Sequence, residues 1–112
     1  LIVDMLKIML KKLGYEVLAT TNSRQALQIF RENIADIDAV ILDMNMPQMS
    51  GKEMFIKMKE LDPNVRVLLS SGYGQSEEAQ EILNLGAKDL LPKPYKISEL
   101  AQKIQQVIMT KN

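Results

Sequence analysis

The chain has 112 residues, and its 14 Lys and Arg residues balance 14 Asp and Glu residues to a formal net charge of zero. This length suits one compact domain, and the neutral balance argues against nucleic acid binding. The chain has no Cys and no His, which excludes disulfides and thiolate metal sites and removes the commonest general base, and no apolar run reaches the roughly 18 residues that span a bilayer, so we expect a cytoplasmic location.

The first third of the chain predicts two helices around a short strand. Apolar residues at helical spacing predict a helix over residues 1–13, which Gly14 ends. Residues 15–19 predict a short strand. Asn22 is the predicted N-cap of the second helix, with Gln25 at the capping-box position three residues later.

The middle of the chain predicts a buried strand followed by a helix. Residues 39–42 are apolar without a break and lead into Asp43, which is typical of a strand covered on both faces of a parallel sheet. We expect this to be the most buried strand of the protein. Ser50 and Glu53 form a capping box that predicts the start of the third helix.

The last part of the chain continues the alternation. A second buried strand is predicted at 65–69 and a weaker helix at 76–85, and Gly86 is expected to end that helix. A short strand at 87–91 and a long helix over 98–110, starting at Ser98, complete the predicted elements.

Alternating strands and helices predict an α/β fold with a doubly wound parallel sheet and right-handed crossovers. Ligands of such sheets bind beyond the carboxyl ends of the strands. The residues there are Thr20 and Thr21, Asp43, Ser71 and Lys93.

The carboxylate of Asp43, the hydroxyl of Ser71 and the ammonium of Lys93 are expected to meet at this edge. Together they suit phosphoryl transfer, in which the carboxylate is the nucleophile and the other two groups stabilise the phosphoryl oxygens. A hard divalent cation, for which Mg²⁺ is the natural choice, would join the carboxylate to the phosphate. The plainer interpretations are a carboxylate that caps a loop, an ordinary strand-end hydroxyl and a solvated lysine.

Three motifs in the predicted order resemble those of response regulator receiver domains. They are Val-Ile-Leu-Asp-Met-Asn-Met-Pro at 40–47, Leu-Leu-Ser-Ser-Gly-Tyr at 68–73 and Gly-Ala-Lys-Asp-Leu-Leu-Pro-Lys-Pro-Tyr at 86–95. The resemblance runs over the whole chain with matching spacing. It implies a flavodoxin-like fold with strand order 2-1-3-4-5 and a place in two-component signal transduction.

The resemblance also implies a role for each matched residue. Asp43 would accept a phosphoryl group from a histidine kinase or a histidine phosphotransfer protein. The backbone carbonyl of Asn45 would bind Mg²⁺ beside Asp43, while Ser71 and Lys93 would bind the phosphate. The peptide bond between Lys93 and Pro94 would be cis.

The sequence departs from the family pattern in two places. The family's first strand and the acidic pair that follows it have no match, so we expect 1–112 to be an N-terminally incomplete receiver domain. Asp4 is not a convincing substitute for the pair, although residues 1–3 as the first strand stay an alternative. Leu90 occupies the position of the family's switching Phe or Tyr.

The resemblance implies an output surface formed by helix 76–85, strand 87–91 and helix 98–110. This surface would bind a downstream effector or a second copy of the chain. Two origins stay open, a single-domain regulator and a receiver from a longer protein such as a hybrid histidine kinase. The implied activity is that of a phosphoacceptor, with at most Mg²⁺-dependent self-phosphorylation and autodephosphorylation.

Three other functions are alternatives to that of a phosphoacceptor. A haloacid-dehalogenase-like phosphatase needs a second Asp where Asn45 stands, and a flavodoxin-like FMN binder needs a phosphate loop that the sequence lacks. A pseudo-receiver that only binds protein partners is the remaining alternative. The polar residues Asp43, Ser71 and Lys93 argue against it, and the missing acidic pair favours it.

Overall fold

A computed structural model describes residues 2–44, 49–71, 77–92 and 96–109. In chain order, its elements are α1 (Ile2–Lys12), α2 (Ser23–Glu32), β1 (Val40–Asp43), α3 (Gly51–Leu61), β2 (Val67–Ser71), α4 (Glu77–Leu85), β3 (Asp89–Pro92) and α5 (Ile97–Met109). None of these described helices has the length and apolar content needed to cross a bilayer.

The three strands form one parallel sheet in the order β1-β2-β3. Asp43 of β1 lies opposite Ser70 of β2, and Ser71 lies opposite Pro92 of β3. Successive strands are joined through α3 and α4, because parallel neighbours need a crossover connection. All three strands therefore point the same way, and their carboxyl ends share one edge of the sheet.

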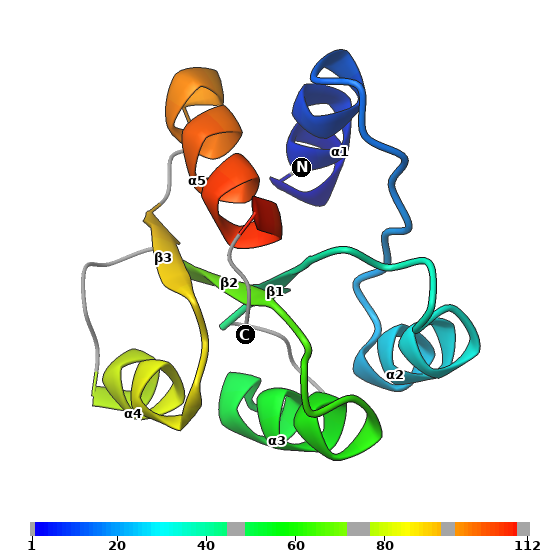
Figure 1. Cartoon of the computed structure of the whole chain (residues 1–112), viewed down its shortest axis with the longest axis vertical. Helices are drawn as coiled ribbons and strands as arrows, with labels where there is room; N and C mark the ends of the chain where they lie inside the picture. Colours follow the sequence, from blue (N-terminus) through cyan, green and yellow to red (C-terminus); the bar gives the residue numbers. More distant parts are fainter. Residues whose placement is uncertain (1, 45–48, 72–76, 93–95, 110–112) are drawn as a thin grey trace.

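Helices cover both faces of the sheet (Figure 1). α1 and α5 pack on one face, and α2, α3 and α4 pack on the other. Each face has its own apolar core, with Phe30, Leu42, Phe55, Leu69 and Ile82 on the α2–α3–α4 face and Leu10, Leu68, Leu91, Leu100 and Ile104 on the α1–α5 face. The predicted doubly wound α/β architecture is confirmed.

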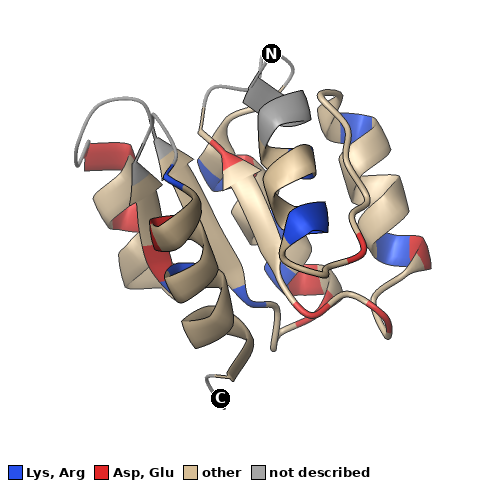
Figure 2. Cartoon of the chain, turned by 90° about the horizontal axis from the view of Figure 1, so that it is seen from above, with Lys and Arg blue, Asp and Glu red and all other residues tan. Residues whose placement is uncertain are grey.

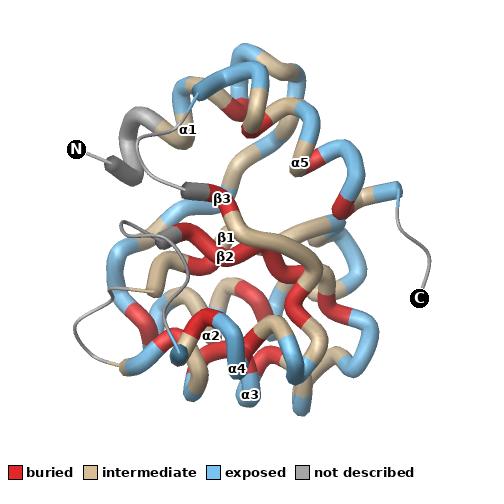
Figure 3. Tube along the Cα trace, turned by 90° about the vertical axis from the view of Figure 1, so that its left-hand side faces the viewer, coloured by how far each residue is buried: buried red, intermediate tan, exposed pale blue. Residues whose placement is uncertain are grey.

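Charged residues lie mainly on the helices and loops outside the sheet (Figure 2), and buried residues concentrate in the strands and the inner helix faces (Figure 3). The most buried strand is β2, where Val67, Leu68 and Leu69 are each 0% exposed. The prediction that the strand ending at Asp43 would be the most buried is wrong. β1 lies at an edge of the described sheet, whereas β2 has a neighbour on each side.

Side chains cap the helix starts that the sequence predicted. The Asn22 Oδ1 atom accepts from the Gln25 N–H at 3.0 Å, and the Ser50 Oγ atom accepts from the Glu53 N–H at 3.1 Å. The Gln25 side chain does not complete a reciprocal box, because its oxygen accepts from the Thr20 hydroxyl at 2.7 Å. Both N-caps are therefore confirmed, and each satisfies an amide that the helix leaves unpaired.

Glycines end α1 and α4 as predicted. Gly14 has φ +93° and Gly86 has φ +124°. In both turns the amide after the glycine donates to the carbonyl five residues earlier, at 3.1 Å. This bond is the mark of a Schellman motif, which requires a positive φ that glycine adopts without a steric penalty.

The predicted strand at 15–19 is wrong, because these residues form no strand. Their side chains do alternate as a strand would, with Tyr15 and Val17 packed against the α1–α5 core and Leu18 61% exposed. A strand also needs a neighbour to hydrogen-bond, and in the family that neighbour is the first strand, which no described residue forms. Alternating burial of the side chains is therefore not enough to make these residues a strand.

The alternative of a first strand at residues 1–3 is also wrong, because Ile2 and Val3 belong to α1. The other predicted elements are present with boundaries shifted by one or two residues. For example, α5 begins at Ile97 rather than Ser98, and the Leu100 N–H donates to the Lys96 carbonyl at 2.9 Å.

Candidate functional site at the carboxyl edge of the sheet

The carboxyl ends of the three strands meet at one edge of the sheet. β1 ends at Asp43, β2 at Ser71 and β3 at Pro92. Adjacent strands lie about 4.8 Å apart, and the register sets Asp43 opposite the residue just before Ser71. The ends of β1 and β3 therefore flank the end of β2 at one edge of the sheet.

Asp43 is held at this edge by the backbone around it. The Met44 N–H donates to the Ser70 carbonyl at 3.1 Å, which extends the pairing of β1 and β2 one residue past Asp43. The Asp43 residue is only half-buried, so its carboxylate avoids the full cost of removing a charge from water. The backbone fixes Asp43 at this edge, and the residue remains partly exposed.

The other predicted site residues are described only in part. Ser71 is the last residue of β2, where its backbone is placed but its side chain is not described. Asn45, Lys93 and Pro94 lie outside the described residues. Ser70, which precedes Ser71 and also carries a hydroxyl, is only 1% exposed.

Leu90 lies in β3 and packs against the core of the α2–α3–α4 face. Its carbonyl accepts a hydrogen bond from the Lys103 ammonium of α5 at 2.5 Å, and the same ammonium lies 3.3 Å from the Asp89 carboxylate. At the position where the family carries a switching aromatic, this chain therefore has a direct polar contact between β3 and α5.

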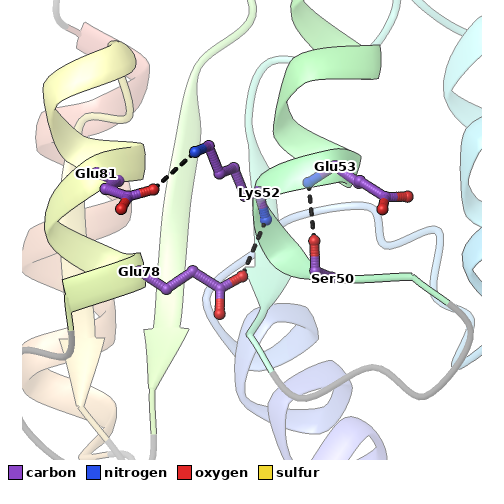
Figure 4. Close-up of polar contacts among 5 residues, drawn as sticks. All are labelled: Ser50, Lys52, Glu53, Glu78 and Glu81. Atoms are coloured by element: carbon purple, nitrogen blue, oxygen red, sulfur yellow. Dashed lines mark hydrogen bonds and ion pairs between the residues drawn. The ribbon is translucent and has the colours of Figure 1, made fainter.

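Polar contacts join α3 to α4, and the sequence patterns did not predict them (Figure 4). The Lys52 ammonium lies 2.7 Å from the Glu81 carboxylate, and the Lys52 backbone N–H donates to the Glu78 carboxylate at 3.4 Å. The hydrogen bond and charge of Glu81 raise the pKa of Lys52 above its ordinary value of 10.5, with a smaller contribution from Glu78. Two lysines, Lys52 and Lys59, share one face of α3, and two glutamates, Glu78 and Glu81, share one face of α4. This pattern indicates two faces of opposite charge but not that the two faces meet.

A metal ligand set is only partly described. Among the described residues, no three Asp, Glu, His or Cys side chains form a group that could hold a metal. The Asp43 carboxylate is an oxygen ligand of the kind that Mg²⁺ prefers, so it fits one position of a magnesium site at this edge.

A cavity of about 180 Å³ lies at the opposite edge of the sheet, beside the amino ends of β1 and β2. Its lining includes Phe30, Asp38, Val65 and Arg66. The Nε atom of Arg66 is buried without a hydrogen-bond partner in the described part of the chain. This cavity is separate from the edge that carries Asp43.

Comparison with known proteins identifies the protein family to which this fold belongs. The model of the response regulator receiver domain family matches residues 1–105. The chain belongs to this family and is a receiver domain of two-component signalling. Members of the family are phosphoacceptors rather than classical enzymes, which sets aside the phosphatase and FMN-binding alternatives.

Individual relatives agree with this assignment. The chain is 35% identical over 104 residues to the chemotaxis protein CheY of Thermotoga maritima, covering 92% of this chain and 85% of that protein. It is 35% identical over 101 residues to sporulation initiation phosphotransferase F of Bacillus subtilis, covering 90% of this chain and 80% of that one.

Solved structures share the fold. A receiver domain from Clostridium thermocellum superimposes with a TM-score of 0.90 at 34% identity, covering 96% of this chain and 85% of that one. The receiver domain of a Pseudomonas aeruginosa sensor histidine kinase, at TM-score 0.84 and 23% identity, has a magnesium ion coordinated in its active-site cleft and covers 96% and 88% of the two chains.

Proposed function

We propose that this chain accepts a phosphoryl group on Asp43 from the phosphohistidine of a histidine kinase or a histidine phosphotransfer protein. The observation that carries the proposal is the position of Asp43, half-buried at the carboxyl end of β1 and opposite β2 in register. A partner of this kind works inside the cell, so we also expect a cytoplasmic location.

The transfer is a nucleophilic substitution at phosphorus. A carboxylate oxygen of Asp43 attacks the phosphorus atom, and an O–P bond forms as the P–N bond to the donor imidazole breaks. The electron pair of that bond returns to the imidazole nitrogen, which takes a proton. The product is an aspartyl phosphate that carries about −1.5 to −2 charge in total, in place of the single negative charge of the free carboxylate.

The remaining site residues would stabilise this charge. Lys93 would donate from its ammonium and Ser71 from its hydroxyl to the phosphoryl oxygens, and a cis bond between Lys93 and Pro94 would aim the lysine into the site. Mg²⁺ would be held by the Asp43 carboxylate and the Asn45 backbone carbonyl. When bound, such an ion supplies charge neutralisation between carboxylate and phosphate.

Phosphorylation would alter the surface formed by α4, β3 and α5, through which a downstream effector or a second copy of the chain would bind. Ser71 directly precedes the segment that leads into α4, so its movement toward a phosphoryl group would displace that helix. With leucine at position 90, the family's aromatic rotation cannot operate, and α4 would carry more of the response.

Incubation with acetyl phosphate and Mg²⁺, followed by intact-mass spectrometry, tests the proposal. The full-length protein should gain the mass of one phosphoryl group, and Asp43→Asn should gain none. Asp38→Asn, which changes an exposed carboxylate just before the same strand, should gain the group as the parent does. No gain in the parent protein would instead support the pseudo-receiver, which binds partners without phosphorylation.

Ser71→Ala separates acceptance from response. The variant should still gain the phosphoryl group, because the nucleophile is intact, but the hydrogen-exchange change in α4 on phosphorylation should shrink severalfold. A response in α4 equal to that of the parent would contradict the proposed role of Ser71.

A further inference from the structure

α3 and α4 are joined by polar contacts at both of their ends, and we refer to these contacts as the α3–α4 bridge. At the amino ends, Lys52 contacts Glu81 and Glu78 as described above (Figure 4). At the carboxyl ends, the Lys59 ammonium donates to the Leu85 carbonyl at 3.1 Å. α3 and α4 follow parallel strands, so the amino ends of the two helices lie side by side, and so do their carboxyl ends.

Each helix caps the other. The backbone N–H of Lys52 is one of the amides that the first turn of α3 leaves unpaired, and Glu78 of α4 accepts from it. The carbonyl of Leu85 is one of the groups that the last turn of α4 leaves unpaired, and Lys59 of α3 donates to it. An anion at a helix start and a cation at a helix end also suit the helix dipoles.

The bridge matters because α4 has little apolar anchoring of its own. Its buried residues are Ala79 and Ile82, and one of these is the smallest apolar side chain. α3 in contrast buries Met54, Phe55 and Met58. α4 therefore has fewer large buried side chains than α3, and the polar contacts with α3 add to what holds it in position.

The amino-terminal part of the bridge also lies close to Asp43. A Cβ atom added to Gly51 would come within 3.1 Å of the Met44 Sδ and 3.5 Å of the Met44 Cα. The first turn of α3, where Lys52 lies, therefore packs directly against the residue that follows Asp43. A change at the carboxylate has a short mechanical route to Lys52.

We propose that Lys52 is a positioning residue whose contacts with Glu81 and Glu78 hold α4 against α3 in the unphosphorylated conformation and so set the switching equilibrium. This inference rests on the proposed phosphoacceptor function. Moving α4 away from α3 requires these contacts to break. Their loss lowers the free-energy difference between the two conformations before any phosphoryl group is present.

Thermodynamic linkage predicts that removing the ion pair strengthens the binding of a phosphoryl mimic rather than weakening it. A ligand that binds one conformation gains apparent affinity in proportion to the population of that conformation. An exposed ion pair contributes little, so breaking it should tighten the binding of a phosphoryl mimic by about two- to fivefold. A variant that merely damages the fold would weaken binding instead.

The experiment measures beryllofluoride affinity in the presence of Mg²⁺, from hydrogen exchange of the 77–85 amides in the full-length protein. Lys52→Gln and Glu81→Gln remove the two partners of the ion pair, and the double variant completes a mutant cycle. Lys57→Gln is the matched control, because Lys57 is an exposed lysine of the same helix.

The proposal expects each single variant to bind beryllofluoride about two- to fivefold tighter than the parent, and the double variant to be no tighter than the singles, because all three lose the same contact. Lys57→Gln should match the parent. Unchanged or weaker binding in Lys52→Gln or Glu81→Gln, or additive effects in the double variant, overturns it. If the parent binds no beryllofluoride, the phosphoacceptor function fails and this inference fails with it.

Discussion

α3 and α4 are neighbouring helices on one face of the same sheet, and they are held there by different forces. α3 buries three large apolar side chains, Met54, Phe55 and Met58, each at most 3% exposed. α4 buries only Ala79 and Ile82, and polar contacts at its two ends join it to α3.

The difference shows how one fold can combine a rigid element with an adjustable one. Apolar burial is stabilising in proportion to area and has few alternative arrangements in a packed core. An exposed ion pair contributes at most about 1 kcal/mol and can exchange partners. A helix with few large buried side chains, held in part by such contacts, can move without unfolding the domain.

The largest expected effect comes from the rigid helix. Phe55→Ala should lower the free energy of unfolding by about 3–5 kcal/mol, since Phe55 is 1% exposed and its removal leaves a cavity. Ile56→Ala, next to it on α3 and 40% exposed, should cost under about 1 kcal/mol. Urea unfolding measures both values, and equal losses would contradict the contrast between the two sides of α3.

The carboxyl end of α4 should show the next largest effect. Gly86→Ala places a Cβ on a backbone with positive φ and into the Lys59 ammonium, so the expected loss is about 2–4 kcal/mol. Gly14→Ala has the same kind of φ but open space around the Cβ, and it should cost about 1–2 kcal/mol. Thermal or urea unfolding measures both variants, and the difference between their losses in unfolding free energy is the contribution of the contact with Lys59.

Salt should weaken the amino-terminal part of the bridge. Lys52 and Glu81 are about half exposed, with side chains 44% and 54% accessible, and the Debye length falls from about 10 Å at 0.1 M salt to about 3 Å at 1 M. Lys52→Gln should speed exchange of the α4 amides about twofold at low salt, and the difference should nearly vanish at 1 M. A salt-independent difference would mean that Lys52 acts by packing rather than by charge.

The smallest expected effect is the loss of the stabilising contribution of Lys52 at alkaline pH. The pKa of Lys52 is raised above 10.5 by Glu81, so the charged lysine is favoured in the folded state. Its contribution is fully present below pH 10.5 and is lost as the pH rises through the raised pKa. The stability difference between the parent and Lys52→Gln should be constant from pH 7 to about 10 and decline above that range, as urea unfolding at each pH would measure.

Features encoded in a few neighbouring residues were predictable from the sequence. The N-caps Asn22 and Ser50 and the helix-ending glycines Gly14 and Gly86 depend on contacts within five residues, and all four are where the patterns indicated. The carboxyl-edge location of Asp43 and Ser71 was also predictable, because alternating strands and helices impose parallel topology.

Features that depend on distant partners were not predictable. The side chains of residues 15–19 alternate in burial like those of a strand, but no described strand lies beside them to pair with. β2 is more buried than β1 because of its central place in the sheet, not because of its composition. The Lys52–Glu81 pair joins residues 29 apart in the chain. Local periodicity contains no information about such a partner.

We propose that Asp43, Ser71 and Lys93 converge on one phosphoryl group. A crystal structure of the protein with beryllofluoride and Mg²⁺ tests this convergence most directly. We predict beryllium bonded to an Asp43 carboxylate oxygen, with the Ser71 hydroxyl and the Lys93 ammonium about 2.7–3.2 Å from its fluorines. Beryllofluoride bound elsewhere, or Lys93 pointing away from Asp43, would contradict the account.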